Sequence, residues 1–172
     1  MKQLVCVFFL GLLVAHEANA QTSAADNKVQ ESITFEDPPR GRDIYGVFEG
    51  RTPCDISRQL GDPQPDCDHL KWQVLFYKDT MTQQPATYML RTELFGRRPL
   101  KGAWRVVRGM KDDPDAVVYA LDYGTNKVLY LFKGDDNVLF ILDEERAFLV
   151  GDKEWSYTLN RVQKIRRQPP GN

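Results

Sequence analysis

The chain has 172 residues, of which 42% are hydrophobic and 27% charged, and its 23 Lys and Arg residues are balanced by 24 Asp and Glu residues. The resulting net charge of −1 excludes a strong overall positive field that would point to a nucleic-acid partner, and no such partner is expected. His16 and His69 are the two histidines, which argues against a metal site or a catalytic apparatus built from several imidazoles.

The N-terminus has the pattern of an export signal. A positive start at Lys2 is followed by an apolar run over residues 4–15 and by Ala18-Asn19-Ala20, which places small residues where a signal peptidase cleaves. The run is shorter than the roughly 20 residues that span a bilayer, and no later segment is apolar enough to do so. We expect residues 1–20 to be a signal peptide and the remaining 172 − 20 = 152 residues to be a soluble, periplasmic or secreted protein without a transmembrane segment.

The mature chain divides into three parts. Residues 21–42 are polar, which is typical of a flexible leader, and the two large apolar residues near its middle fit a short strand over residues 32–36. Residues 43–162 carry the strand signals of one domain. Residues 163–172 form a basic tail that is too short to fold by itself.

From residue 43 onward, short runs of β-branched and aromatic residues alternate with clusters of Gly, Pro, Asp and Asn, a pattern that indicates β-strands. Within one run, Leu70, Trp72 and Val74 fall on the same face, as in a half-buried strand. No segment keeps the spacing of an amphipathic helix. The predicted strands are residues 44–49, 70–78, 87–95, 103–107, 116–122, 127–132, 138–142, 147–150 and 155–162.

Eight or nine short antiparallel strands must either close on themselves or pack as two sheets, because exposed strand edges invite aggregation. We therefore predict an all-β fold, a small antiparallel β-barrel, with a β-sandwich as the alternative. The runs 128–132 and 138–142 are apolar on both faces. They predict a second cover over this part of the sheet, from the leader or from a partner.

Cys54 and Cys67 are the two cysteines that remain after signal removal, in a compartment where thiols oxidise. A disulfide between them closes a loop of about 15 residues and contributes roughly 3 kcal/mol. One alternative is a soft-metal site for copper or zinc with Cys54, Cys67 and His69 as ligands, and the other is a pair of free thiols. We expect no other cofactor.

The sequence contains no motif of a catalytic site. Ser57 lacks the Gly-x-Ser-x-Gly pattern of a nucleophile elbow. Carboxylates cluster at residues 112–115, 135–136 and 143–145, all at predicted turns, where Asp hydrogen-bonds its own backbone. We therefore expect a protein that is not an enzyme.

Aromatic residues occur on nearly every predicted strand. In a small barrel such residues either fill the interior or line a ligand cavity, and the sequence leaves both uses open. They are Trp72, Phe76, Tyr77, Tyr88, Phe95, Trp104, Tyr119, Tyr130, Phe132, Phe140, Trp155 and Tyr157.

Several short motifs occur in a recognisable order. They are residues 45–54 (YGVFEGRTPC), the strands at 70–77 and 88–94, Gly102-Ala103-Trp104, and the late strand ends at 121–122 and 139–143. With these motifs the chain resembles the N-terminal domain of NlpE-like envelope proteins, described as copper-resistance or envelope-stress lipoproteins. The resemblance implies a small lipocalin-like barrel. The family's second cysteine follows the first in a C-x-x-C motif, whereas here Cys54 is followed by Asp55-Ile56-Ser57, and the lipid-attachment cysteine is absent.

We therefore expect an exported, non-enzymatic β-barrel protein of the bacterial envelope that acts by binding a partner or by sensing the state of the envelope. The resemblance implies a role in stress sensing or copper homeostasis. Two alternatives are a lipocalin-like carrier of a small apolar ligand and a soft-metal binder that uses Cys54, Cys67 and His69.

Overall fold

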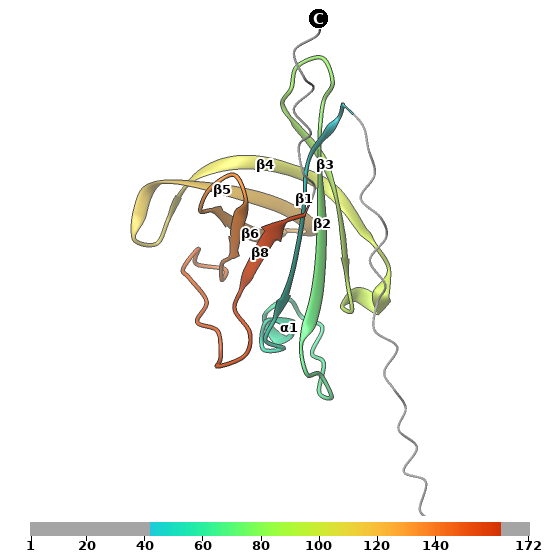
Figure 1. Cartoon of the computed structure of the whole chain (residues 1–172), viewed down its shortest axis with the longest axis vertical. Helices are drawn as coiled ribbons and strands as arrows, with labels where there is room; N and C mark the ends of the chain where they lie inside the picture. The colour runs from blue at the N-terminus through green and yellow to red at the C-terminus, as the bar shows by residue number, and fades with distance from the viewer. Residues whose placement is uncertain (1–41, 163–172) are drawn as a thin grey trace, which may run out of the picture. The chain divides into compact units, whose positions relative to one another are not determined.

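The computed structural model describes residues 42–162, which form a closed antiparallel β-barrel (Figure 1). Its strands are β1 (Ile44–Thr52), β2 (Leu70–Lys78), β3 (Pro85–Thr92), β4 (Leu100–Met110), β5 (Asp113–Gly124), β6 (Lys127–Lys133), β7 (Val138–Ile141) and β8 (Thr158–Arg161). The short helix α1 (Ile56–Gln59) lies between β1 and β2, and the 3-10 turn η1 (Phe95–Arg97) lies between β3 and β4.

Each strand pairs with the next one in the sequence, and β8 returns to pair with β1, where Phe48 faces Arg161 and Glu49 faces Asn160. This last pairing closes the sheet and removes its edges. The predicted small barrel is therefore confirmed, and the two-sheet alternative does not apply.

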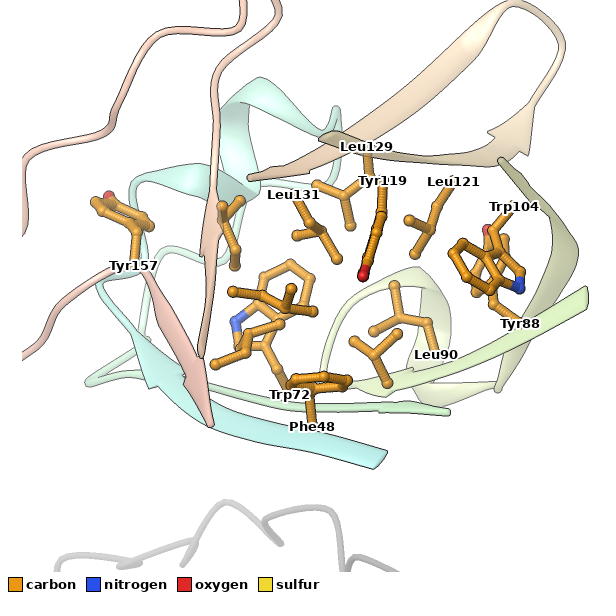
Figure 2. Close-up of a cluster of buried hydrophobic side chains, with 14 of the residues drawn as sticks. Phe48, Trp72, Tyr88, Leu90, Trp104, Tyr119, Leu121, Leu129, Leu131 and Tyr157 are labelled. Atoms are coloured by element: carbon orange, nitrogen blue, oxygen red, sulfur yellow. The ribbon is translucent and has the colours of Figure 1, made fainter. Parts of the chain in front are cut away.

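The core lies inside the barrel, where alternate residues of every strand converge (Figure 2). On β2, Trp72, Val74 and Phe76 point inward and are fully buried, as the alternation of the sequence predicts. The predicted aromatic residues that belong to this core are Trp72, Phe76, Tyr88, Trp104, Tyr119 and Tyr157. Aromatic and leucine side chains thus fill the interior of the described barrel.

Most predicted strands have shifted ends in the structure, and the last two are lost or shortened. Residues 147–150 form no strand and make one isolated bridge, between Leu142 and Phe148, because the Asp143 carboxylate accepts a hydrogen bond from the Ala147 backbone and holds a turn. The predicted strand at 155–162 is shortened to β8. The Asp152 carboxylate accepts hydrogen bonds from the backbone N–H groups of Glu154 and Trp155, which folds residues 152–155 into a turn.

The outer face of β5, β6 and β7 carries a second apolar cluster. Phe132, Phe140 and Phe148 lie together there, with ring centroids 5.4 to 6.1 Å apart. Phe148 comes from the segment between β7 and β8, so at least part of the predicted second cover is supplied by the barrel domain itself. Val118 and Leu142 beneath these rings are 0% and 1% exposed.

The predicted signal peptide, residues 21–41 of the predicted leader with the predicted strand at 32–36, and the whole basic tail (163–172) lie outside the described residues. Within residues 42–162, no helix is long and apolar enough to cross a membrane.

Candidate binding site at one end of the barrel

The even-numbered strands of this barrel run in the same direction, so β2, β6 and β8 finish at the same end. Each of these three strands closes with a basic residue: Lys78, Lys133 and Arg161. We call this end the cationic end. The connection between β1 and β2, with α1 and the two cysteines, lies at the opposite end, which we call the disulfide end.

Four aromatic side chains pack together beneath the cationic end, and we refer to Tyr45, Phe76, Trp104 and Tyr119 as the aromatic cluster. Tyr45 stacks on Trp104 at 5.4 Å with an angle of 29° between the rings, and Phe76 meets Trp104 edge-on at 4.9 Å. The Trp104 indole N–H donates to the Tyr77 carbonyl at 2.7 Å, which fixes the ring. Tyr45 is half-buried, whereas the other three are buried. The cluster therefore presents one partly accessible ring to the barrel end.

Two cations surround that ring. Lys78 Nζ lies 4.4 Å from the centroid of Tyr45, and Arg161 Cζ lies 5.4 Å from it and 4.6 Å from the Phe48 ring. All three distances are within the range of cation–π attraction. Arg161 is held in place because Nη1 donates to the Tyr45 carbonyl at 2.9 Å and Nε to the Asp136 carbonyl at 2.6 Å.

A glycine makes room for this arginine. A Cβ on Gly46 would collide with the Arg161 guanidinium and lie 2.9 Å from the Phe48 ring. Only a residue without a side chain therefore lets Arg161 cross this point of β1. Glycine weakens a strand, and the sequence around Gly46 gives no local reason for one. We infer that Gly46 allows the Arg161 guanidinium to lie close to the backbone of β1.

The third cation pairs with the carboxylate of the cationic end. Lys133 Nζ lies 2.7 Å from Asp136 Oδ1, an interaction that raises the pKa of Lys133 and lowers the pKa of Asp136. Nearby Tyr45 raises the pKa of Lys133 further, and Arg161 lowers it. With Lys78, Lys133 and Arg161 against Asp136, the formal charge of these side chains is 3 − 1 = +2. Asp43 and Asp79 line a hollow together with Lys78, so the excess of positive charge is local to the Tyr45 ring, where Lys78 and Arg161 would attract an anion.

Two tyrosine hydroxyls meet within the aromatic cluster. Tyr45 Oη and Tyr119 Oη are 2.6 Å apart. Burial raises the pKa of Tyr119 far above its ordinary value, and the hydrogen bond with Tyr45 adds to the shift. The Tyr119 hydroxyl therefore keeps its proton at neutral pH. Because the pair uses one of its two hydrogens internally, the other remains available as a neutral donor.

The residues that the sequence singled out lie at the disulfide end. Cys54 and Cys67 form the predicted disulfide, with 6.0 Å between their Cα atoms. His69 packs against Trp155, with ring centroids 4.7 Å apart, and its Nδ1 lies 2.7 Å from Asp68 Oδ2. The disulfide therefore staples the α1 connection and takes no part in the cationic end.

In this oxidised state neither Cys54 nor Cys67 offers the thiolate that a soft metal needs. Within residues 42–162, no three His, Cys, Asp or Glu side chains come close enough together to hold a metal ion. A site made of Cys54, Cys67 and His69 thus requires the disulfide to be reduced first.

The sequence analysis did not single out Lys78, Lys133 and Arg161, because single basic residues at strand ends have no motif. From the sequence, Lys78 ends the second predicted strand and Lys133 follows the sixth, which puts these two at one end of a closed antiparallel barrel. Arg161 lies in the ninth predicted strand and joins them only because residues 147–150 form no strand, so that its own strand becomes the eighth.

Comparison with protein-family models, with curated proteins and with solved structures finds no match for this chain. The resemblance to NlpE-like proteins therefore stays a prediction.

Proposed function

We propose that the protein is a non-enzymatic binding protein of an exported compartment, and that its barrel binds a small amphiphilic anion at the cationic end. One observation carries this proposal: two cations, Lys78 and Arg161, lie within 4.4 and 5.4 Å of the centroid of the same half-buried ring, that of Tyr45.

The site suits a ligand with an anionic head and an apolar body. A carboxylate or sulfonate head accepts charge-assisted hydrogen bonds from Lys78 and Lys133, and each such bond contributes about 1.5–3 kcal/mol when it is desolvated. The free hydrogen of the tyrosine pair adds a neutral donor. The apolar body covers the exposed part of the Tyr45 ring.

The ligand binds at the end of the barrel and does not enter it deeply. Behind Tyr45, the interior is occupied by Phe48, Phe76 and Trp104, which are 1%, 0% and 3% exposed. This arrangement argues against a carrier that encloses its ligand inside the barrel, because such a lipocalin-like pocket needs roughly 300 Å³ or more of free interior.

The predicted signal peptide and the disulfide support an oxidising, exported location, in agreement with the envelope role that the resemblance to NlpE-like proteins implies. Sensing through Cys54 would take place at the disulfide end. The cationic end repels metal cations, so copper binding is not proposed there.

Calorimetric titration of the mature protein with dodecanoate, and with dodecanol as the uncharged analogue, tests the proposal. We expect binding of dodecanoate and at least about tenfold weaker binding of dodecanol. Lys78→Met should weaken dodecanoate binding by about tenfold, whereas the matched variant Lys153→Met, an 88% exposed lysine between β7 and β8, should leave it unchanged.

Equal affinity for the acid and the alcohol would contradict an anion site. An equal loss of dodecanoate affinity in Lys78→Met and Lys153→Met would show a non-specific charge effect instead of a site at Tyr45.

A further inference from the structure

A hollow with a volume of about 380 Å³ lies on the outside of the barrel, where β1 and β8 pair and close the sheet (Figure 1). We call it the polar hollow. Phe48 and Leu159 belong to the interior core, so the residues next to them on these two strands point outward. The lining includes Glu49 and Arg51 from β1, Thr158 and Asn160 from β8, and Glu154 and Trp155 from the segment before β8. None of these residues belongs to the cationic end.

The Glu49 carboxylate is held in place from behind. Gln73 on β2, which is 0% exposed, donates from Nε2 to Glu49 Oε1 at 2.7 Å. Arg91 on β3 donates in turn to Gln73 Oε1 at 2.8 Å. Within residues 42–162 Glu49 makes no other side-chain hydrogen bond, so its second oxygen is available to a donor that enters the hollow.

Trp155 carries an unused hydrogen-bond donor. Its ring packs on His69, with ring centroids 4.7 Å apart, and its backbone N–H donates to the Asp152 carboxylate at 2.7 Å, which fixes its position. The indole N–H is buried and has no acceptor in the part of the chain that the structure describes. Buried tryptophan N–H groups usually have a partner, so this one points to an acceptor from outside the protein.

The polar hollow offers both donors and acceptors. The exposed side chains of Arg51 and Asn160 make no hydrogen bond within residues 42–162 and can donate, as the Trp155 N–H can. One guanidinium stands against two carboxylates, of which Glu154 also pairs with Lys153 at 3.4 Å, so no excess of positive charge attracts an anion.

A cation does not suit these groups either. An ammonium group has no lone pair, so it leaves the unused donors of Trp155 and Asn160 without an acceptor. A hydroxyl donates and accepts at the same time. A neutral ligand with several hydroxyls therefore satisfies both the donors and the carboxylates.

We propose that the polar hollow is a second binding site of this barrel, and that it binds a neutral sugar of one or two rings. Its volume of about 380 Å³ lies at the small end of ligand pockets, which run from roughly 300 to 1,000 Å³. One hydroxyl accepts from the Trp155 indole N–H, and others bridge Glu49 and Asn160, which face each other across β1 and β8. The site does not depend on the anion site at Tyr45.

Titration of the mature protein with maltose, followed in a nitrogen-15 correlation spectrum, tests the proposal. We expect the Trp155 indole signal to move and to saturate in the millimolar range. The indole signals of Trp72 and Trp104 should stay in place, because these groups already donate to the Thr52 hydroxyl and the Tyr77 carbonyl.

Two variants locate the site. Asn160→Ala should weaken maltose binding by at least about fivefold, whereas the matched variant Asn137→Ala, an exposed asparagine in the turn before β7, should leave it unchanged. Arg51→Gln, on the other closing strand, should weaken binding as well, so the result does not rest on the folding of one variant.

No movement of the Trp155 signal at about 100 mM maltose would overturn the proposal. A Trp155 response to spermidine or to sulfate, with none to maltose, would assign the hollow to an ion and would also overturn it. An equal loss of maltose affinity in Asn160→Ala and Asn137→Ala would contradict a site between β1 and β8.

Discussion

The two ends of the barrel are built from opposite chemistry. At the disulfide end, Ile56 and Leu60 of the α1 connection pack into the core with 2% and 5% exposure, and a covalent bond between Cys54 and Cys67 holds that connection. At the cationic end, Lys78 and Arg161 lie against one half-buried ring, that of Tyr45, and Lys133 pairs with Asp136.

This difference separates stability from binding. Like charges repel, so the cationic end adds little to the stability of the fold unless an anion arrives. The disulfide end contributes to the stability of the fold, because its cross-link lowers the conformational entropy of the unfolded chain. Changes at one end should therefore alter stability and changes at the other should alter affinity, and the predictions below test that division.

The largest effect is expected at the disulfide end. The double variant Cys54→Ser/Cys67→Ser should lose about 3 kcal/mol of unfolding free energy in urea at 25 °C, because the closed loop regains its freedom in the unfolded state. Under conditions where this variant is still folded, its affinity for dodecanoate should stay within about twofold of the parent protein. A folded variant that no longer binds would show that the two ends are coupled.

The second effect concerns Tyr88, inside the barrel, whose hydroxyl donates to the Asp122 carbonyl at 2.7 Å. Burial raises the pKa of Tyr88 to about 12. As the pH rises above the ordinary tyrosine pKa of about 10, the unfolded chain loses this proton first, so stability present below pH 10 is lost toward pH 12, at up to about 1.4 kcal/mol per pH unit.

Urea titrations at pH 9 and pH 11.5 check this prediction. Tyr88→Phe should reduce the alkaline loss of stability, to which the raised pKa of Tyr119 also contributes. If the parent protein and Tyr88→Phe lose the same stability over this range, Tyr88 is not the group responsible.

A third prediction sharpens the contrast between the ends. In Gly46→Ala, the added methyl group displaces the Arg161 guanidinium from Tyr45, so dodecanoate affinity should fall by about fivefold. Stability should fall by roughly 1 kcal/mol, because the methyl group also lies 2.9 Å from the buried Phe48 ring, which has to shift. Gly124→Ala, whose Cβ would make an ordinary 3.6 Å contact with Lys127, serves as the control and should change neither quantity.

The smallest effect is expected for Asp136→Asn. This change removes the carboxylate that pairs with Lys133, while the Asp136 backbone carbonyl still accepts from Arg161. Dodecanoate binding should tighten by about twofold at low salt, and the gain should vanish near 1 M salt, where charges are screened within about 3 Å. Weaker binding would mean that the Asp136 carboxylate helps binding by holding Lys133 in position, and that this effect exceeds the cost of neutralising its charge.

The barrel and its staple could be predicted from the sequence because both depend on local signals. Alternation along residues 70–76 reports which side chains face inward, and two cysteines in an exported chain indicate a disulfide. The segment at 147–150 was predicted wrongly, because Phe148 packs on the outside of β6 and β7, Leu149 packs against the interior core, and Val150 is exposed.

The cationic end was not predicted, because its residues come together only when β8 pairs with β1 and closes the barrel. Phe48 and Arg161 are far apart in the sequence and meet through the pairing of β8 with β1. The requirement for Gly46 arises from that same crossing. Such contacts depend on the register of strands, and the sequence fixes a register only where one face of the strand is clearly apolar.

The three tryptophan indole N–H signals in a nitrogen-15 correlation spectrum test the central claim most directly. Trp104 belongs to the aromatic cluster, whereas Trp72, which donates to Thr52 at 2.8 Å, and Trp155, which packs on His69, lie toward the disulfide end. Titration with dodecanoate should shift the Trp104 signal and leave the other two in place. Shifts confined to Trp72 or Trp155, or no shift at saturating ligand, would contradict an anion site at the cationic end.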